Sequence, residues 1–375
     1  MKVKRFPVYT LSACLVAIVW YFAPEQDLAI TDPTRKDPPN GSNGVMEIVD
    51  TGQGTHGTNP GESLPNSVGE ERKTPPSQGF QHLLEPHDLE GAHFDRWLKG
   101  KEDDAGELAK AKVTAGILSE NDGLLREGVE MDDENPMLAY VGATDDAFSG
   151  EEQLLHSKRF YANDPENALA AFIYATRLFE HGKKEGAFQV LQKSKDRQVL
   201  DDYTQESLRL MKEAYQAAEY TELDAQLQSM FQLGKPYLGD LLSFAGELDD
   251  VADTLPAQEA KNLRNLASSM GIRVSQSATT GTLLDQLTGL AMEERSLEGI
   301  GEGDNSPFEG MTVEEARTSI KGRKDRLKMV MSKFAGMDEV NVLSKDPVLM
   351  EGYLEEFWKS GELGAIQWLL LQVGE

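Results

Sequence analysis

Hydrophobic side chains recur every three or four positions from about residue 81 onward, the spacing that places them on one face of an α-helix. Leu208, Met211, Tyr215 and Ala218 follow this spacing. No run of β-branched residues is long enough to predict a sheet. The pattern therefore predicts an all-α fold.

Local signals mark several helix boundaries. Thr312 and Glu315 form a capping box before a long helical segment, and Asp346-Pro347 supplies an N-cap and a first-turn proline before the last one. Three glycines are expected at helix ends or tight turns: Gly182, Gly234 and Gly361.

Two pairs of segments resemble each other within the chain. The segment 133–140 is similar to 165–172, and 186–191 is similar to 364–369. Repetition at this scale is typical of stacked supersecondary units. We therefore expect helical hairpins that pack against one another, with an irregular helical bundle as the alternative.

The segment 168–196 is similar to a helical hairpin of the tetratricopeptide-repeat family, and the similarity extends over about 130–230. Small and large residues occupy the packing positions of that hairpin, with a glycine at its turn: Ala171, Tyr174, Ala175, Leu178, Gly182, Ala187 and Leu191. The family's tryptophan position holds Ala171, and the spacing drifts between units. The resemblance implies an α-solenoid that binds a peptide or protein on its concave face.

The N-terminus carries a predicted membrane anchor. A basic head with Lys2, Lys4 and Arg5 precedes the stretch 6–24, which has no charged residue. As a helix this stretch is about 28 Å long, close to the roughly 30 Å hydrocarbon core. The basic head favours a cytoplasmic N-terminus. We expect a single-pass inner-membrane protein whose folded domain is periplasmic.

Two other fates of the N-terminus stay open. Cleavage by signal peptidase would release the chain, although Pro24 follows the small residue Ala23 directly. Leu11-Ser12-Ala13-Cys14 is similar to a bacterial lipobox, with Cys14 as the acyl acceptor. The residues after Cys14 remain apolar, whereas lipoproteins usually continue into a polar tether.

The next segment, 25–80, has the composition of a disordered stalk. It contains seven prolines and eight glycines and few aliphatic residues, so it cannot bury enough apolar surface to offset chain entropy. The predicted organisation is then a helical repeat-like domain over 81–298, a loop over 299–310 and a C-terminal helical segment over 311–375.

Charge narrows the range of partners. The chain has 64 acidic and 37 basic residues and a formal net charge of −27, which argues against nucleic-acid binding. One basic run stands out in this acidic background: Lys321, Arg323, Lys324, Arg326 and Lys328. It predicts either a docking face for an acidic partner or anionic lipid, or a solvated helix face that neutralises the protein's own carboxylates.

The motifs of common enzymes and cofactor sites do not occur in the sequence. It has no nucleophile elbow, zinc-protease helix, P-loop or dinucleotide fingerprint, and we predict no cofactor and no catalytic or metal-ligating set. The leading hypothesis is a membrane-tethered scaffold or adaptor that mediates protein–protein interaction in the cell envelope. The alternatives are an all-helical hydrolase or lyase acting on polysaccharide or peptidoglycan, using His156 or His181, and a structural spacer.

Overall fold

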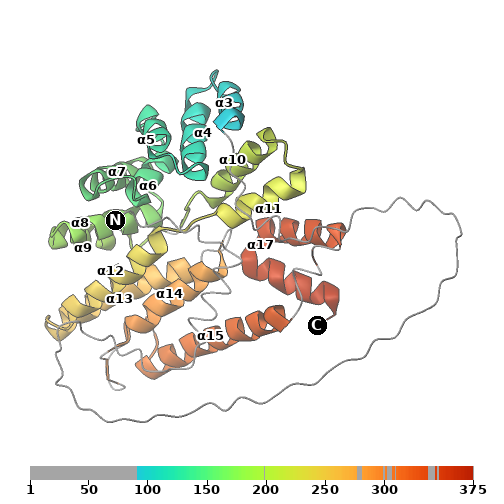
Figure 1. Ribbon diagram of the computed structural model, residues 1–375. Coiled ribbons are helices and arrows are strands. Elements are labelled where there is room, and N and C mark those ends of the chain that lie inside the picture. Colours follow the sequence, from blue (N-terminus) through green and yellow to red (C-terminus); the bar gives the residue numbers. More distant parts are fainter. Residues whose placement is uncertain are drawn as a thin grey trace, which may run out of the picture.

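The computed structural model describes residues 91–197, 199–276, 281–298, 300–301, 306–308, 310–336, 343 and 346–374. This part of the chain forms fourteen helices and no strand, which confirms the predicted all-α class (Figure 1). The first seven are α3 (Gly91–Lys99), α4 (Ala105–Leu118), α5 (Asp122–Met131), α6 (Pro136–Thr144), α7 (Gly150–Asn163), α8 (Ala168–Glu180) and α9 (Lys184–Ser194). The others are α10 (Thr204–Ala217), α11 (Glu222–Gln232), α12 (Tyr237–Ala252), α13 (Ala257–Ser275), α14 (Leu283–Arg295), α15 (Val313–Gly336) and α17 (Pro347–Val373).

The predicted caps are present where helices begin. The Thr312 amide donates to Glu315 Oε2 at 2.8 Å, and the Glu315 amide donates to Thr312 Oγ1 at 3.2 Å. Asp346 Oδ1 accepts the first-turn amides of Val348 and Leu349. These bonds satisfy amides that lack a partner inside the helix, so both sequence signals are confirmed.

The similarity between 133–140 and 165–172 has a structural counterpart. Asn135 Oδ1 accepts the amide of Met137 at 3.1 Å at the start of α6. Asn167 Oδ1 accepts the amide of Leu169 at 3.0 Å at the start of α8. The two similar segments therefore begin two helices in the same way.

Neighbouring helices pack as hairpins: α4 on α5, α6 on α7, α8 on α9, and later α13 on α14. Alternate helices also touch, because α6 contacts both α4 and α8, and α8 contacts α12. Arg177 on α8 ties this layer together, since it donates to Ala143 O at 3.1 Å and to Asp240 on α12 at 2.6 Å. In Figure 1 the helices of this layer, α4, α6, α8 and α12, follow one another from the top of the picture toward the lower left.

The segment between α9 and α10 turns back over this layer. Val199 O accepts the amide of Ala168 at 2.8 Å, and the ring of Tyr203 lies 5.9 Å from those of Tyr140 and Phe160. Helix α10 then packs against α3 and α4. Residues 199–217 therefore cover part of the layer formed by α4 and α6.

A first hydrophobic cluster runs from α4 through α9 and includes residues of α12, α13 and α14. A second hydrophobic cluster joins α10, α11 and α14 to the C-terminal helices α15 and α17. Gly361 divides α17 at a kink, with φ of +74°. A Cβ there would lie 2.8 Å from the carbonyl oxygen of Gly281, so the close approach of these two segments requires glycine. Gly182, which follows α8, also has a positive φ, +72°.

The predicted anchor, Cys14 and stalk, residues 1–80, lie outside the residues that the structure describes, as do 81–90 of the predicted helical domain. None of the helices that it describes is both long enough and apolar enough to span a bilayer.

Candidate functional site

The residues predicted to pack the hairpin lie on α8 and α9. Ala171 and Ala175 on α8 and Ala187 and Leu191 on α9 are buried in the first hydrophobic cluster. Tyr174 is half-buried, with its ring 5.4 Å from that of Tyr161 on α7. These positions hold helices together and present no reactive group.

The predicted basic run lies on α15 and divides between two faces. Arg323 donates to Glu293 on α14, a carboxylate that is fully buried, with one contact of 2.9 Å. Lys324 pairs with Glu294 on the same helix. These two cations therefore neutralise the protein's own carboxylates and join α15 to α14.

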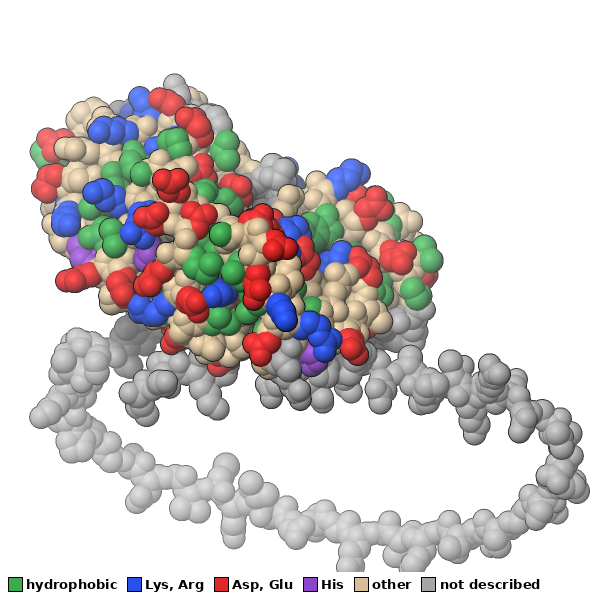
Figure 2. Space-filling view, turned by 90° about the horizontal axis from the view of Figure 1, so that it is seen from above, with side chains coloured by type: hydrophobic (Ala, Val, Ile, Leu, Met, Phe, Trp, Pro, Cys, Tyr) green, Lys and Arg blue, Asp and Glu red, His purple; other side chains and the backbone are tan. Residues whose placement is uncertain are grey.

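The remaining members of the run, Lys321, Arg326 and Lys328, are exposed on the other side of α15, as is Lys333 beyond it. Met329 lies among them with 56% of its surface exposed. Acidic side chains are spread over much of the molecular face shown in Figure 2, with basic ones interspersed. The exposed side of α15 thus carries local positive charge in an acidic molecule.

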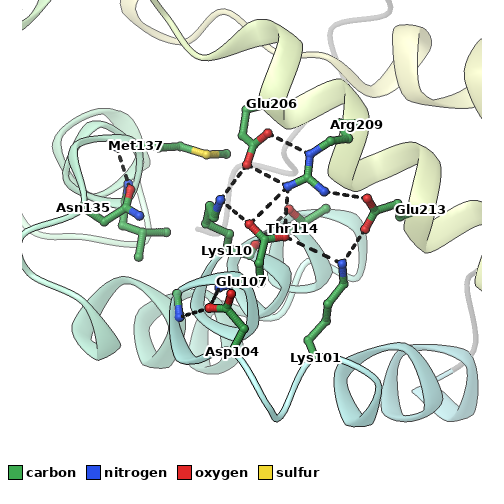
Figure 3. Close-up of polar contacts among 12 residues, drawn as sticks. Lys101, Asp104, Glu107, Lys110, Thr114, Asn135, Met137, Glu206, Arg209 and Glu213 are labelled. Atoms are coloured by element: carbon green, nitrogen blue, oxygen red, sulfur yellow. Dashed lines mark hydrogen bonds and ion pairs between the residues drawn. The ribbon is translucent and has the colours of Figure 1, made fainter.

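An ionic seam joins α10 to the start of the fold (Figure 3). Its six members are Lys101, Glu107, Lys110, Glu206, Arg209 and Glu213. Arg209 on α10 reaches Glu107 on α4 at 3.0 Å and Glu213 on its own helix at 2.6 Å. Across the seam, Lys110 donates to Glu206 at 2.7 Å and Lys101 to Glu213 at 2.8 Å.

The seam favours the charged form of two of its carboxylates, Glu206 and Glu107. Hydrogen bonding from Arg209, against partial burial, lowers the pKa of Glu206 to about 2. Burial alone would raise the pKa of Glu107, but Lys110 and Arg209 outweigh it and lower that pKa. Beneath these charges, Leu210 and Ala214 of α10 pack with Trp97 and Ala111. The seam therefore closes over an apolar contact and has a structural role.

A further set of deeply buried charges lies where three connections meet. Lys235 precedes α12, Asp202 precedes α10, and Asp285 lies in the first turn of α14; all three side chains are at most 4% exposed. Lys235 pairs with Asp202 and lies 3.6 Å from Asp285. Its ammonium also donates to Thr204 Oγ1 at 2.7 Å. We call Asp202, Lys235, Tyr237 and Asp285 the buried lysine centre.

Burial and charge act in opposite directions in this centre. Burial opposes the ammonium form, but Asp202 and Asp285 outweigh it and raise the pKa of Lys235. Burial likewise opposes the Asp202 carboxylate, but Lys235 outweighs it and lowers that pKa. The Tyr237 hydroxyl lies 3.0 Å from Asp202 and 3.1 Å from Asp285, and burial and these carboxylates raise its pKa. The two carboxylates thus favour the charged ammonium over the neutral amine that a nucleophilic lysine requires.

The buried lysine centre was not predicted from the sequence. Its members lie just before α10, at the start of α12 and in the first turn of α14, so no local spacing connects them. The available signal is the surrounding pattern: Lys235 stands between Leu233 and Tyr237, two buried residues. A lysine in such a context is expected to be solvated, unless the fold supplies carboxylates.

The two histidines of the enzyme hypothesis lie at separate places. His156 is buried against Phe148, at 5.0 Å between ring centroids, and a Cβ at Gly142 would lie 2.6 Å from its ring. His181 follows α8, with Nδ1 2.8 Å from the carbonyl oxygen of Arg177. Among the described residues, no group of three His, Cys, Asp or Glu side chains could hold a metal ion.

The chain matches no protein-family model, no curated protein and no solved structure.

Proposed function

We propose that this protein is a membrane-tethered helical-repeat scaffold or adaptor that mediates protein–protein interaction outside the cytoplasm. The observation that carries the proposal is the succession of hairpins α4–α5, α6–α7 and α8–α9, in which alternate helices also contact one another. Such arrays offer large, shape-stable surfaces to other proteins. The tetratricopeptide-like character of the array and the membrane anchor at residues 1–24 belong to this proposal.

One segment restricts where the proposed adaptor could bind a partner. The resemblance implies binding on the concave face, but residues 199–217 lie over α4 and α6, and α10 forms ion pairs with Glu107 and Lys110 of α4. Tyr203 is fixed there, because its hydroxyl donates to Asp164 at 2.6 Å and its ring packs on Tyr140. A partner would have to displace this segment, so the proposed adaptor binds through other exposed surfaces.

The proposal is tested by cross-linking the full-length chain in intact membranes of its own cells. The control is the segment 1–90 fused to an inert soluble domain, which keeps the predicted anchor and stalk. We expect at least one protein that is cross-linked reproducibly by the full-length chain and not by the control. Identical cross-linked sets would contradict an adaptor function and would support the spacer alternative.

The predicted topology has a separate test. Cysteine is introduced at exposed Gln189 on α9 in a Cys14→Ser background, and intact cells permeable only at the outer membrane are treated with a membrane-impermeant maleimide. Labelling is expected, because the folded domain is proposed to face the periplasm. Labelling only after the inner membrane is disrupted would place the domain in the cytoplasm.

A further inference from the structure

The buried lysine centre holds an amine and a carboxyl group in contact, with a second carboxylate beside them. Lys235 Nζ donates to Asp202 Oδ2, and Asp285 Oδ2 lies 3.6 Å from the same nitrogen. The Tyr237 hydroxyl bridges the two carboxylates, at 3.0 Å from Asp202 and 3.1 Å from Asp285. An amine, a carboxyl group and groups that relay protons between them are the components that amide formation requires.

Burial brings the ion pair closer in energy to its neutral form. The charged pair is the main form and the state in which the chain folds, but it differs from a neutral amine beside a neutral acid only by one proton between Lys235 and Asp202. Both side chains are buried, and a water-poor site penalises two ions more than two neutral groups. A reaction that each molecule undergoes once needs the neutral pair only transiently.

The fold also supplies the driving force for condensation. A separate amine and acid do not condense in water, whereas groups that are held together react with effective concentrations of about 10⁵–10⁸ M. Thr204 fixes both reacting groups, because its Oγ1 accepts from Lys235 Nζ at 2.7 Å and its amide donates to Asp202 Oδ1 at 3.2 Å. The two side chains are therefore oriented toward each other before any bond forms.

We propose that Lys235 and Asp202 condense slowly after folding, so that an amide bond cross-links their side chains. The ammonium first passes one proton to the Asp202 carboxylate. Its Nζ then attacks Asp202 Cγ, so that the Nζ–Cγ bond forms and the Cγ–Oδ2 bond breaks. A second proton passes from Nζ through Asp285 and Tyr237 to the departing oxygen, which leaves as water. Both relay groups end in their initial protonation state, and no group is oxidised or reduced.

The cross-link joins the segment that covers α4 and α6 to the start of α12. The two residues are 33 positions apart, with α10 and α11 between them, and a covalent bond that closes such a loop restricts the unfolded chain. The single cysteine of the sequence is Cys14, so no disulfide within this chain can cross-link residues 91–374. In the product the amide nitrogen keeps one hydrogen, which it can donate to the buried Asp285 carboxylate.

The test is mass spectrometry of the full-length chain, kept folded in detergent for increasing times and then denatured and digested with trypsin. The peptides 198–209 and 213–261 carry the two reacting residues. We expect them to be joined in a species lighter by one water than their sum, with fragment ions that place the bond between Asp202 and Lys235. Its share should increase with time. Lys110 and Glu206, paired at 2.7 Å at a partly exposed site, are the internal control and should stay unmodified.

Asp285→Asn tests the proton relay. This variant keeps both reacting groups and nearly the same side-chain volume, but its amide does not accept the proton from Nζ. We expect the cross-linked peptide to form at least about a hundredfold more slowly than in the wild type. The matched control is Asp249→Asn, which changes another buried aspartate, paired with Arg264 at 2.7 Å, and should cross-link at the wild-type rate. Circular dichroism confirms that both variants fold.

Four results would overturn the proposal. Separate peptides at their sequence masses in aged, folded protein would show that the centre is an ion pair only. A loss of water confined to the linear peptide 198–209 would indicate a cyclic imide at Asp201 or Asp202. Equal cross-linking of Lys110 to Glu206 would indicate dehydration that is independent of burial. Equal rates in Asp285→Asn and the wild type would exclude the relay through Asp285 and with it the proposed reaction.

Discussion

Replacing Lys235 by methionine should strongly destabilise this protein, because the lysine is the cation of a buried group of charges. In the wild type one ammonium faces two buried carboxylates, Asp202 and Asp285. Methionine fills a similar volume without the charge. The variant therefore keeps both carboxylates in a water-poor site and removes the cation that stabilises them.

The expected magnitude follows from what remains around each carboxylate. Asp202 keeps the Thr204 amide at 3.2 Å and the Tyr237 hydroxyl, and Asp285 keeps the Thr282 amide at 2.7 Å. These neutral donors do not replace a full positive charge. Removing one partner of a buried ion pair typically costs about 3–5 kcal/mol, and we expect a loss in that range for Lys235→Met.

The assay is urea unfolding of the full-length chain at pH 7, followed by helical circular dichroism. The matched control is Lys212→Met, because Lys212 also pairs with a glutamate, Glu222, but at a site where that glutamate is 65% exposed. Exposed pairs contribute about 0.2–1 kcal/mol. Similar losses for the two variants would refute the argument from burial.

A pH series and a second substitution sharpen this test. In the wild type the folded-state pKa of Asp202 lies below its ordinary value of 3.8. Its contribution is therefore present above that value and is lost as pH falls through the folded-state pKa. In Lys235→Met, burial should raise the folded-state pKa of Asp202, so that folding takes up a proton. The stability difference between the variant and the wild type should therefore become smaller from pH 7 to pH 5. Adding Asp202→Asn should restore stability at pH 7; a further additive loss would contradict the proposed coupling.

Three other predictions concern separate parts of the fold. Gly289→Ala should lower the free energy of unfolding by about 1–3 kcal/mol, because its Cβ would lie 2.3 Å from the Ser275 nitrogen. The control Gly322→Ala, on an exposed part of α15, should leave this free energy unchanged or raise it by up to about 1 kcal/mol. Equal urea midpoints for the two variants would contradict the close packing at Gly289. Arg209→Met should cost about 1 kcal/mol at low salt and clearly less in 1 M NaCl, and a loss independent of salt would show that the seam acts through packing alone. Burial lowers the pKa of His156, so the unfolded chain takes up the proton first and the wild type should lose stability as pH falls below about 6.5. The unfolding temperature of His156→Gln, measured from pH 7.5 to 5, should lack the part of the decrease that His156 causes in the wild type. Identical pH profiles for the two proteins would refute the role of His156.

The sequence predicted helix boundaries well where they depend on a few neighbouring residues. Thr312 and Glu315 form a capping box from side chains one turn apart, and Asp346 caps its helix through the same local geometry. Asn135 and Asn167 were flagged by internal similarity, and both proved to be N-caps. A cap is decided within about four residues, so its signal survives in the linear sequence.

The division of the basic run on α15 depended on tertiary structure. Lys321 and Arg323 look alike in sequence, yet one is exposed and the other meets a buried glutamate on α14. Which cation pairs is determined by the rotation of α15 about its axis and by the neighbour that it meets.

The sequence by itself determined that the chain is helical, where many of its helices begin, and that its charge is strongly negative, because these properties arise from residues that are near one another or from simple sums. Only the tertiary structure decided that residues 199–217 cover the layer of α4 and α6, and that Lys235 meets Asp202 and Asp285. Those contacts join residues separated by several helices. They depend on how loops direct each helix and on whether a buried charge finds its partner, and neither is encoded in local spacing.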